Sequence, residues 1–445
     1  MRIPTSRLIA YAGPGVPMAA MGLPLVVFVP AFYAGEIGLD LALVGLIFGL
    51  VRTIDTAFDL IVGNWADNTR TRFGRFKPWL VGGGLIATAS TVAVFYPPQN
   101  ATIFWLFFGL IGLYAGQSMV NVPHTSWGAT LTEDYHERSR VYTFWQGGHL
   151  VGLILVLMLP AILDLVMGDA APRAVHAMGF FILASLVLTI PAACALVPRT
   201  NSQLTTARIR WADVKRLLAD PHLRLILVAD ISVNLAAGSL GTLFRFFAEN
   251  ARGFDDSLSS LGLLIFFLTG LLALPLWLRL AKRIGKAKAS AFATLWTAVA
   301  HVIAFFLYDP DDLWISTFAL MISGFSYAAP NLLLRAMLAD HADDEKARGG
   351  TDRVGLLNAV LTTAMKVGYV IPVATLLPLL DFFGFDPSPD SVSSPASILA
   401  LEWVWLLSLP VFMLPAIWLQ FRFKADQARH QARLASDAED AATAR

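Results

Sequence analysis

Residues 51–78 read VRTIDTAFDLIVGNWADNTRTRFGRFKP, and this stretch decides the fold class. Its first half is apolar enough to lie in a membrane, yet it contains Arg52, Asp55 and Asp59. Residues three or four apart share one face of a helix, so the three charges lie together. Ionisable groups within a bilayer are costly and usually face the bundle interior or a water-filled cavity. The stretch therefore predicts a membrane helix whose charged face points inward.

The two carboxylates repel each other, and Arg52 can balance only one of them. Lys366, in the middle of a later apolar segment, is a second candidate counter-ion. Two interpretations stay open: a structural salt-bridge network, or a site for a small hard cation such as Na⁺ or a proton. They are compatible if Lys366 balances the acids in one state and releases them to a cation in another.

The composition is that of a polytopic membrane protein. Of the 445 residues, 56% are hydrophobic and only 15% are charged, with a mean hydropathy of +0.62. Soluble proteins carry about a quarter charged residues. The single cysteine, Cys194, excludes an internal disulfide framework and a cysteine-based metal site. No metal site is expected beyond a possible Na⁺ site.

Twelve segments are long and apolar enough to span a bilayer, which takes roughly 20 residues. They lie near 8–33, 41–65, 78–97, 102–129, 141–166, 174–197, 222–248, 258–281, 288–308, 312–338, 354–383 and 396–421. Lys and Arg concentrate in alternate connections, which predicts that these connections and both termini are cytoplasmic. We therefore expect a multi-pass protein of the cell (inner) membrane, in contact with the lipid bilayer.

The chain is expected to form two six-helix bundles. The longest basic connection follows the sixth segment and predicts a linker at 199–221 between bundles at 1–198 and 222–423, with a cytoplasmic tail at 424–445. ATLTEDYHERSR after the fourth segment resembles AMLADHADDEKAR after the tenth. Parallel internal repeats of this kind are typical of transporters.

Other polar residues inside the segments are candidates for a substrate cavity. They are Gln117, Asn121, Thr125, Gln146 and His149, and the fourth segment also holds Ser118. Asp230, Asn234 and Arg245 lie in the seventh segment, with Asp230 and Arg245 too far apart to pair directly. For any single one of these residues, a hydrogen bond between helices is the commoner role.

The loop after the second segment is a candidate gate. Gly74 allows a tight turn. The basic residues Arg70, Arg72 and Arg75 can bridge to helix carbonyls or to acids at helix ends, such as Glu133, Asp134 or Glu137. Asp67 opens this DNTRTRFGRFKP run. The same basic residues also serve as a positive-inside anchor.

With these residues laid out, the chain resembles the glycoside–pentoside–hexuronide:cation symporters, the melibiose-permease branch of the major facilitator superfamily. The resemblance rests on RTIDTAFDLIVGNWADNTRTRFGRFKPWL, NVPHTSW and TTAMKVG. It implies that Asp55 and Asp59 bind the coupling cation, that Ser118 contributes a hydroxyl, and that Arg52 and Lys366 belong to the charge network. It also implies an all-α fold of twelve transmembrane helices in two six-helix bundles.

The chain departs from the sugar-transporting members at several positions. Phe58 replaces a usual Asn, which strengthens the case for protons. The first segment reads GPGVPMAAMG, without the expected acid, and Asn121, Thr125 and Gln146 stand where an Asp, an aromatic residue and an Arg are usual. Such a site loses charge-assisted hydrogen bonds worth about 1.5–3 kcal/mol each. Two substrate classes stay open: a glycoside held by different residues, or an amphiphile as in a related vertebrate lysolipid symporter.

The predicted function is a cation-coupled symporter of a small organic solute that works by alternating access. It uses no cofactor, takes Na⁺ or H⁺ as coupling ion, binds no nucleic acid and acts as a monomer. An enzyme is disfavoured because no clustered acid–base or metal-ligand motif occurs, and no Walker A loop is present for ATP-driven transport. A non-transporting receptor or scaffold is disfavoured because it has no need of mutually repelling charges in the bilayer.

Overall fold

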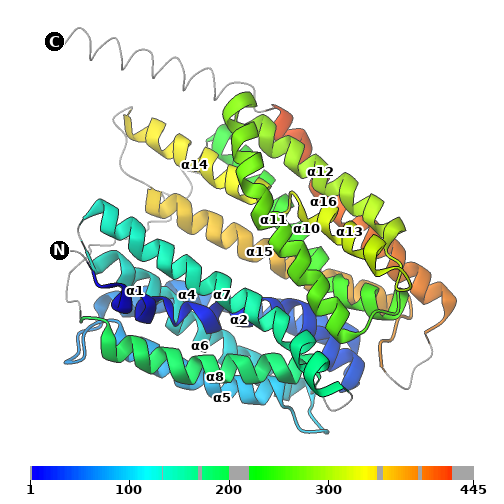
Figure 1. The fold of residues 1–445 in the computed structure, drawn as a ribbon, viewed down its shortest axis with the longest axis horizontal. Coiled ribbons are helices and arrows are strands. Elements are labelled where there is room, and N and C mark those ends of the chain that lie inside the picture. The colour runs from blue at the N-terminus through cyan, green and yellow to red at the C-terminus, as the bar shows by residue number, and fades with distance from the viewer. Residues whose placement is uncertain are drawn as a thin grey trace. The chain divides into compact units, whose positions relative to one another are not determined.

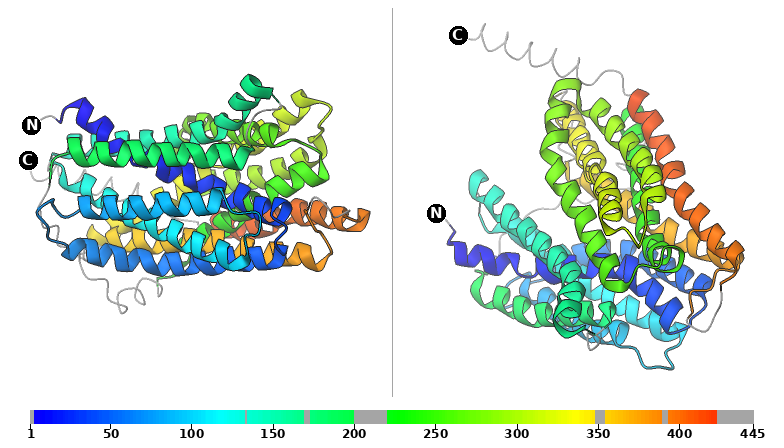
Figure 2. Two further views of the ribbon diagram at one scale, coloured as in Figure 1. Left: turned by 90° about the horizontal axis from the view of Figure 1, so that it is seen from below. Right: turned by 45° about the vertical axis from the view of Figure 1, so that its right-hand side comes forward.

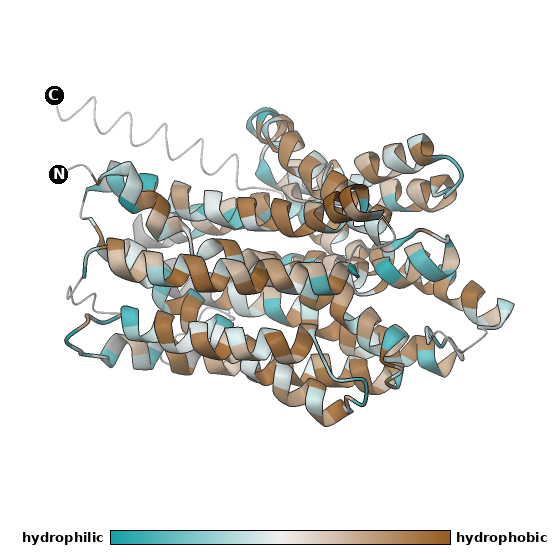
Figure 3. Ribbon diagram, turned by 60° about the horizontal axis from the view of Figure 1, so that its bottom comes forward, coloured by the Kyte–Doolittle hydropathy of each residue, from teal (hydrophilic) through white to brown (hydrophobic). Residues whose placement is uncertain are grey.

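The computed structural model describes residues 3–132, 134–168, 173–199, 220–347, 354–388 and 393–422. Within these ranges the chain contains twelve helices long and apolar enough to cross a membrane, and no strand. The twelve segments expected from the sequence are thereby confirmed. Figure 3 shows apolar residues along the helices and hydrophilic residues gathered toward helix ends and loops. Large apolar side chains such as Leu85, Phe104, Leu188 and Phe306 are exposed, as lipid-facing residues of a membrane protein are.

Two of the spans are interrupted helices. The first runs through α1 (Thr5–Ala12), α2 (Gly15–Leu23), the π-helical turn η1 (Pro24–Phe28), α3 (Val29–Ala31) and the π-helical turn η2 (Phe32–Glu36). The tenth is divided into α13 (Leu313–Gly324) and α14 (Ala329–Ala347). Proline has no N–H and clashes with the preceding turn, so Pro24 and Pro30 explain the irregular hydrogen bonding of the first span.

Each of the other spans is a single helix, and the seventh ends in a π-helical turn. In the first half they are α4 (Leu41–Asn68), α5 (Lys77–Phe95), α6 (Ile103–Thr130), α7 (Tyr135–Met167) and α8 (Ala174–Leu196). In the second half they are α10 (Pro221–Phe246) with the π-helical turn η4 (Phe247–Ala251), α11 (Asp256–Ile284), α12 (Lys286–Leu307), α15 (Val354–Phe382) and α16 (Pro395–Arg422). Side-chain caps begin several helices: the Asp40 carboxylate accepts from Leu43 N at α4, and Asp134 accepts from Glu137 N at α7.

The chain divides by packing into two compact units. The first comprises 1–208, 238–264 and 370–405, and the second comprises 209–237, 265–369 and 406–445. The boundaries of these units follow contacts and not sequence halves, and the predicted division at 199–221 stays a prediction. The linker itself lies outside the described residues except at Arg199, Asp220 and Pro221, and the tail from 424 onward lies wholly outside them.

In the first unit, α5 packs along α6 and α8, α4 packs on α6, and α2 packs on α7. Figures 1 and 2 both show α5 and α8 side by side. Parts of α10, α15 and α16 belong to this unit, and small residues let α10 and α15 approach helices of the first half closely. A Cβ built on Gly49 of α4 would lie 2.5 Å from the Ala374 Cβ of α15, and one on Gly241 of α10 would lie 2.9 Å from Val26 Cγ1. Glycine is thus required at these contacts.

In the second unit, an apolar core joins four helices. It is formed by Leu223, Ile226, Leu227, Ala229 and Val233 of α10, Leu334, Met337 and Leu338 of α14, Leu361 of α15 and Ala416 of α16. An ion pair between Lys286 Nζ and the Asp340 carboxylate, at 2.6 Å, links α12 to α14. α12 also packs on α13.

Candidate functional site

Asp55 of α4 is the most enclosed of the predicted cation-site residues. Its side chain is 4% exposed, and Ser118 Oγ of α6 donates a 2.7 Å hydrogen bond to Asp55 Oδ1. Arg52 lies one turn earlier on α4, with Nη1 3.8 Å from Asp55 Oδ2. A buried carboxylate is costly without hydrogen bonds and a counter-charge, and these two contacts provide both.

Arg52 is held in place by an aromatic ring that the sequence analysis did not single out. Its guanidinium carbon lies 4.8 Å from the centroid of Tyr114, which is buried on α6. A cation over an aromatic face is attracted by the ring quadrupole, and burial strengthens the attraction. Tyr114 lies four residues before Ser118 and therefore on the same face of α6. That spacing is the signal by which Tyr114 could have been found.

Asp59 follows Asp55 by one turn on the same face of α4 and is half-buried. Two carboxylates and a hydroxyl thus lie on the facing surfaces of α4 and α6. Oxygen ligands of this kind suit a hard cation such as Na⁺ or a proton, and not a soft transition metal. Among the described residues, no cluster of three or more His, Cys, Asp or Glu side chains could hold a metal ion.

The predicted cavity residues of α6 differ from one another in their hydrogen-bond partners. Gln117 Nε2 donates to Met18 O of α2 at 3.2 Å, and Thr125 Oγ1 donates to Asn121 O at 2.9 Å. Asn121 Oδ1 is buried and has no hydrogen-bond partner in the described part of the chain. A buried amide oxygen of this kind can accept a hydrogen bond from a ligand.

The predicted residues of α7 lie beside two aromatic rings that the sequence analysis missed. Gln146 is exposed, while His149 is half-buried, with Nδ1 3.0 Å from Trp145 O and its ring 4.2 Å from the Trp145 ring. Tyr142 OH donates to Thr125 O at 3.3 Å and so ties α7 to α6. The spacing of Tyr142, Trp145 and His149 at three and four residues is the helical signal for one aromatic face.

The candidate gating loop turns at Gly74, whose φ of 93° lies in the region that favours glycine. Arg75 is buried and Nε donates to Ala66 O at 2.9 Å, which closes the end of α4. Arg70 and Arg72 are exposed, and in the described residues no carboxylate lies within ion-pair distance of either. The side chain of Asp67 lies outside the described residues.

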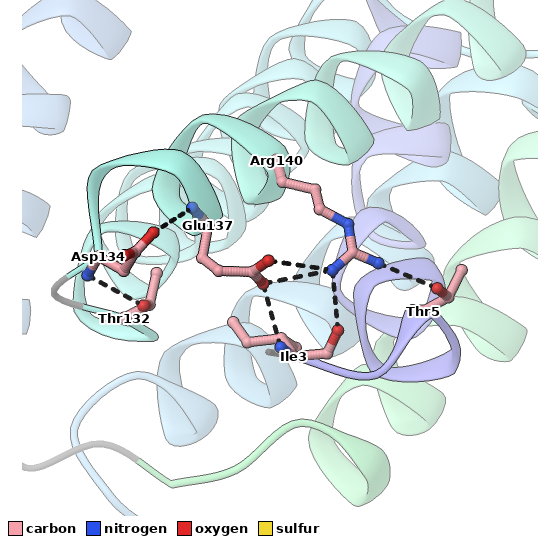
Figure 4. A network of polar contacts seen from close by, with 6 residues as sticks. All are labelled: Ile3, Thr5, Thr132, Asp134, Glu137 and Arg140. Carbon is pink, nitrogen blue, oxygen red and sulfur yellow. Dashed lines mark hydrogen bonds and ion pairs between the residues drawn. The ribbon is translucent and has the colours of Figure 1, made fainter. Parts of the chain in front are cut away.

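The acids expected to face this loop are Glu133, Asp134 and Glu137. Glu133 lies outside the described residues, and Asp134 caps α7. Glu137 accepts from Ile3 N and pairs with Arg140, which also donates to Thr5 (Figure 4). These contacts anchor the start of α1 to the start of α7. The role of the basic loop as a gate stays a prediction.

Lys366 is half-buried on α15 and belongs to the second compact unit. Its predicted exchange with the carboxylates of α4 stays a prediction. The other residues singled out in the seventh span, Asp230, Asn234 and Arg245, have partners of their own. Asn234 Nδ2 donates to Asp230 Oδ2 at 3.1 Å, and Arg245 pairs with Glu249 at 2.5 Å and with Glu36 at 3.8 Å.

Comparison with known proteins decides the family. A family model described as MFS/sugar transport protein matches residues 10–427, nearly the whole chain. The chain belongs to this family of the major facilitator superfamily. The resemblance to the glycoside–pentoside–hexuronide:cation symporters is thereby confirmed, and the protein is a multi-pass membrane transporter and not an enzyme.

Individual relatives are likewise described as transporters or symporters. The isoprimeverose transporter of Lactiplantibacillus pentosus is 24% identical over 413 residues, which cover 89% of this chain and 84% of the relative. The putative glycoside/cation symporter YagG of Escherichia coli (strain K12) is 23% identical over 410 residues, covering 90% and 88%. The crystal structure of the nucleoside transporter NupG superposes with a TM-score of 0.68 at 13% identity, covering 95% of this chain and 100% of that one. This last similarity shows the major facilitator fold alone.

Proposed function

We propose that this MFS/sugar transport family member is a cation-coupled symporter that moves a small, glycoside-like organic solute. The coupling cation, Na⁺ or H⁺, binds at Asp55, Asp59 and Ser118. The observation that carries the proposal is the pairing of a nearly fully buried carboxylate on α4 with a hydroxyl on α6 at 2.7 Å. A membrane protein without a cation to bind has little reason to keep two acids four residues apart in a span.

In this scheme the cation and the solute are coupled because the charges of Asp55 and Asp59 are neutralised reversibly. Arg52 Nη1 lies 3.8 Å from Asp55 Oδ2. At this distance the ion pair is weak, so a bound cation can replace it. Lys366 supplies a second positive charge in this scheme. A cation that binds the acids and a solute that binds the same conformation raise each other's affinity by the same factor. Rocking of the two bundles then exposes both ligands to the other side of the membrane.

The solute is held in this proposal by Gln117, Asn121, Thr125, Gln146 and His149, with Tyr142 and Trp145 as aromatic surfaces. Sugars combine many hydroxyls with apolar ring faces. The unpartnered Asn121 Oδ1 of α6 suits the hydroxyls, and the aromatic face of α7 suits the ring faces. The relatives described as an isoprimeverose transporter and a glycoside/cation symporter support this class. The protein works as a monomer in the cell (inner) membrane with both termini cytoplasmic.

The test is uptake by the purified protein in proteoliposomes. Wild type is expected to accumulate a labelled glycoside when an inward Na⁺ or H⁺ gradient is imposed. Asp59→Asn removes a carboxylate from the cation site, so gradient-driven accumulation is lost while solute exchange across the membrane is retained. Asp164→Asn is the matched control, because Asp164 is exposed on α7 and carries the same change outside the site. Undiminished accumulation by Asp59→Asn would overturn the cation assignment.

An amphiphile is the second candidate substrate, favoured by the absence of any acid between Gly13 and Gly22 in the first span. The same proteoliposomes separate the two classes. Accumulation of a lysolipid, with no accumulation of any glycoside in the panel, would reassign the substrate and leave the cation site in place.

A further inference from the structure

Asp230 is a carboxylic acid buried in a membrane span without a positive partner. It lies on α10 in the span Leu223–Ala251 and is 1% exposed. Asn234 Nδ2, one turn later on the same helix, donates to Asp230 Oδ2 at 3.1 Å and to Asp230 O at 2.7 Å. In the part of the chain that the structure describes, no nitrogen of Lys, Arg or His lies within 4.0 Å of this carboxyl group. The acid is therefore held by a neutral amide.

The surroundings of Asp230 are apolar. Its neighbours Ile226, Ala229 and Val233 belong to the core that α10 forms with α14, α15 and α16. Next to Asn234, α15 approaches so closely that a Cβ on Gly368 would lie 2.5 Å from the Asn234 Cβ. An ionised carboxylate in such a place loses its hydration, and one neutral donor does not replace it. The physically favoured state of such a group is the neutral acid, which carries a proton.

Asp55 of α4 is nearly as buried, at 4% exposed, but it has different neighbours. Its two oxygens are approached by Ser118 Oγ at 2.7 Å and by Arg52 Nη1 at 3.8 Å. Asp230 has a comparable hydrogen bond but lacks the guanidinium. Two acids of similar burial thus differ in their counter-charge, and a difference of this kind determines which acid is charged and which is neutral.

The charge that acts on Asp230 from a neighbouring helix is that of Arg335 on α14. The guanidinium lies beyond ion-pair distance, and its Nη2 is 3.4 Å from Met365 Sδ of α15. Thioether sulfur is a weak acceptor, so this contact holds Arg335 only loosely. Lys366, also on α15, is half-buried and has interactions of its own, and α16 contributes the apolar Ala416 to the core beside Asp230. Arg335 is therefore the group able to balance Asp230 once its proton leaves.

We propose that Asp230 is a proton-binding site of the second unit, in addition to the cation site at Asp55 and Asp59. In the described conformation the acid holds its proton. When the packing of α10 against α14 loosens, the O–H bond of the acid breaks, the proton passes to water, and the carboxylate pairs with the Arg335 guanidinium. Because Asp230 is 1% exposed, proton exchange requires this change in packing. The inference depends neither on the solute nor on the cation that binds at α4.

Infrared spectroscopy of the purified protein in nanodiscs at neutral pH is the direct test. A protonated carboxylic acid has a C=O stretching band separate from the bands of carboxylates and amides. Asp230→Asn should lose the intensity of one carboxylic acid from this band. Asp164→Asn, which changes an exposed aspartate of α7, should keep the full band. If Asp230→Asn does not fold, wild type labelled with ¹³C in its aspartate carboxyl groups replaces it, and part of the band should then shift in frequency.

Thermal unfolding at a series of pH values tests the same assignment by a second route. The folded protein holds the Asp230 proton, whereas an unfolded aspartate releases it above about pH 3.9. Wild type should therefore lose stability relative to Asp230→Asn as the pH rises, because only the unfolded state has given up the proton. The folding equilibrium changes about tenfold for each pH unit over which this holds. Asp230→Asn should thus be at least as stable as wild type at neutral pH.

Arg335→Gln tests the second half of the proposal by removing the counter-charge of the ionised form. The carboxylic acid band should persist in Arg335→Gln at an alkaline pH that abolishes it in wild type. Arg224→Gln, which changes an exposed arginine near the start of α10, should behave like wild type. Loss of the band at the same pH in all three proteins would refute the role of Arg335.

Two results would refute the proton site itself. One is a carboxylic acid band that is the same in wild type and Asp230→Asn, or that does not shift in the labelled protein. The other is a loss of stability in Asp230→Asn at neutral pH, because an ionised and balanced Asp230 would stabilise the folded protein.

Discussion

Ser118 Oγ on α6 donates to Asp55 Oδ1 on α4 at 2.7 Å, and this hydrogen bond joins two helices through a carboxylate that is 4% exposed. Asp55 and Ser118 are separated by 63 positions in the chain. The bond orients one carboxylate oxygen, while Arg52 approaches the other at 3.8 Å. A hydroxyl from α6 and a guanidinium from α4 thus approach the two oxygens of this carboxylate.

Removing this hydroxyl is the first prediction. Ser118→Ala takes away both a hydrogen bond to a charged acceptor and an oxygen ligand for the cation. We expect the half-saturating cation concentration for stimulated solute binding to rise about tenfold or more, as a charge-assisted bond of this kind is worth about 1.5–3 kcal/mol. Ser185→Ala is the matched control, because Ser185 is buried on α8 and donates only to the Ile182 carbonyl. An unchanged cation dependence in Ser118→Ala would remove Ser118 from the site.

The second prediction concerns Arg245 of α10, in the first unit. Its side chain is 4% exposed and pairs with Glu249 and Glu36, with its guanidinium 5.3 Å from the Phe28 ring centroid. Arg245→Ala leaves two carboxylates without this counter-charge, so the protein should lose about 3–5 kcal/mol of stability. The measurement is chemical or thermal unfolding in a fixed detergent.

The exposed arginine of the same cluster serves as the comparison. Arg173 also pairs with Glu36, but its side chain is 61% exposed. Arg173→Ala should therefore cost about 0–1 kcal/mol, as surface ion pairs do. Equal losses for Arg173→Ala and Arg245→Ala would show that burial of Arg245 does not govern the stability of this cluster.

The third prediction uses the close contact between α4 and α15. A Cβ on Gly49 would lie 2.5 Å from the Ala374 Cβ, and neither atom sits at the end of a flexible chain. Gly49→Ala should destabilise the protein by about 1–3 kcal/mol, as overpacking of a tight contact does. Thermal unfolding in nanodiscs measures the effect.

Gly147 provides a control at which the same substitution is expected to raise stability. Gly147 lies inside α7, and a Cβ there meets no atom within 4 Å. Gly147→Ala should raise stability by about 0.5–1 kcal/mol, because alanine loses less backbone entropy in a helix. If both substitutions stabilise the protein, α4 and α15 are not in close contact where Gly49 meets Ala374.

The sequence predicted the twelve spans because each is a local run of apolar residues, and it predicted that Asp55 and Asp59 share a face because helical periodicity is local as well. It also predicted Ser118 as a partner through the family resemblance. It did not find Tyr114, whose contact with Arg52 depends on how α6 packs on α4.

The sequence by itself therefore determined the membrane class, the number of spans and the face of α4 that carries the acids. Only the tertiary structure decided that Ser118 Oγ donates to Asp55 Oδ1, that the Tyr114 ring lies under Arg52, and that Tyr142 ties α7 to α6. The physical reason is that composition and periodicity act over a few residues. The partner of a buried charge is instead set by how helices distant in the chain pack together, which no local pattern encodes.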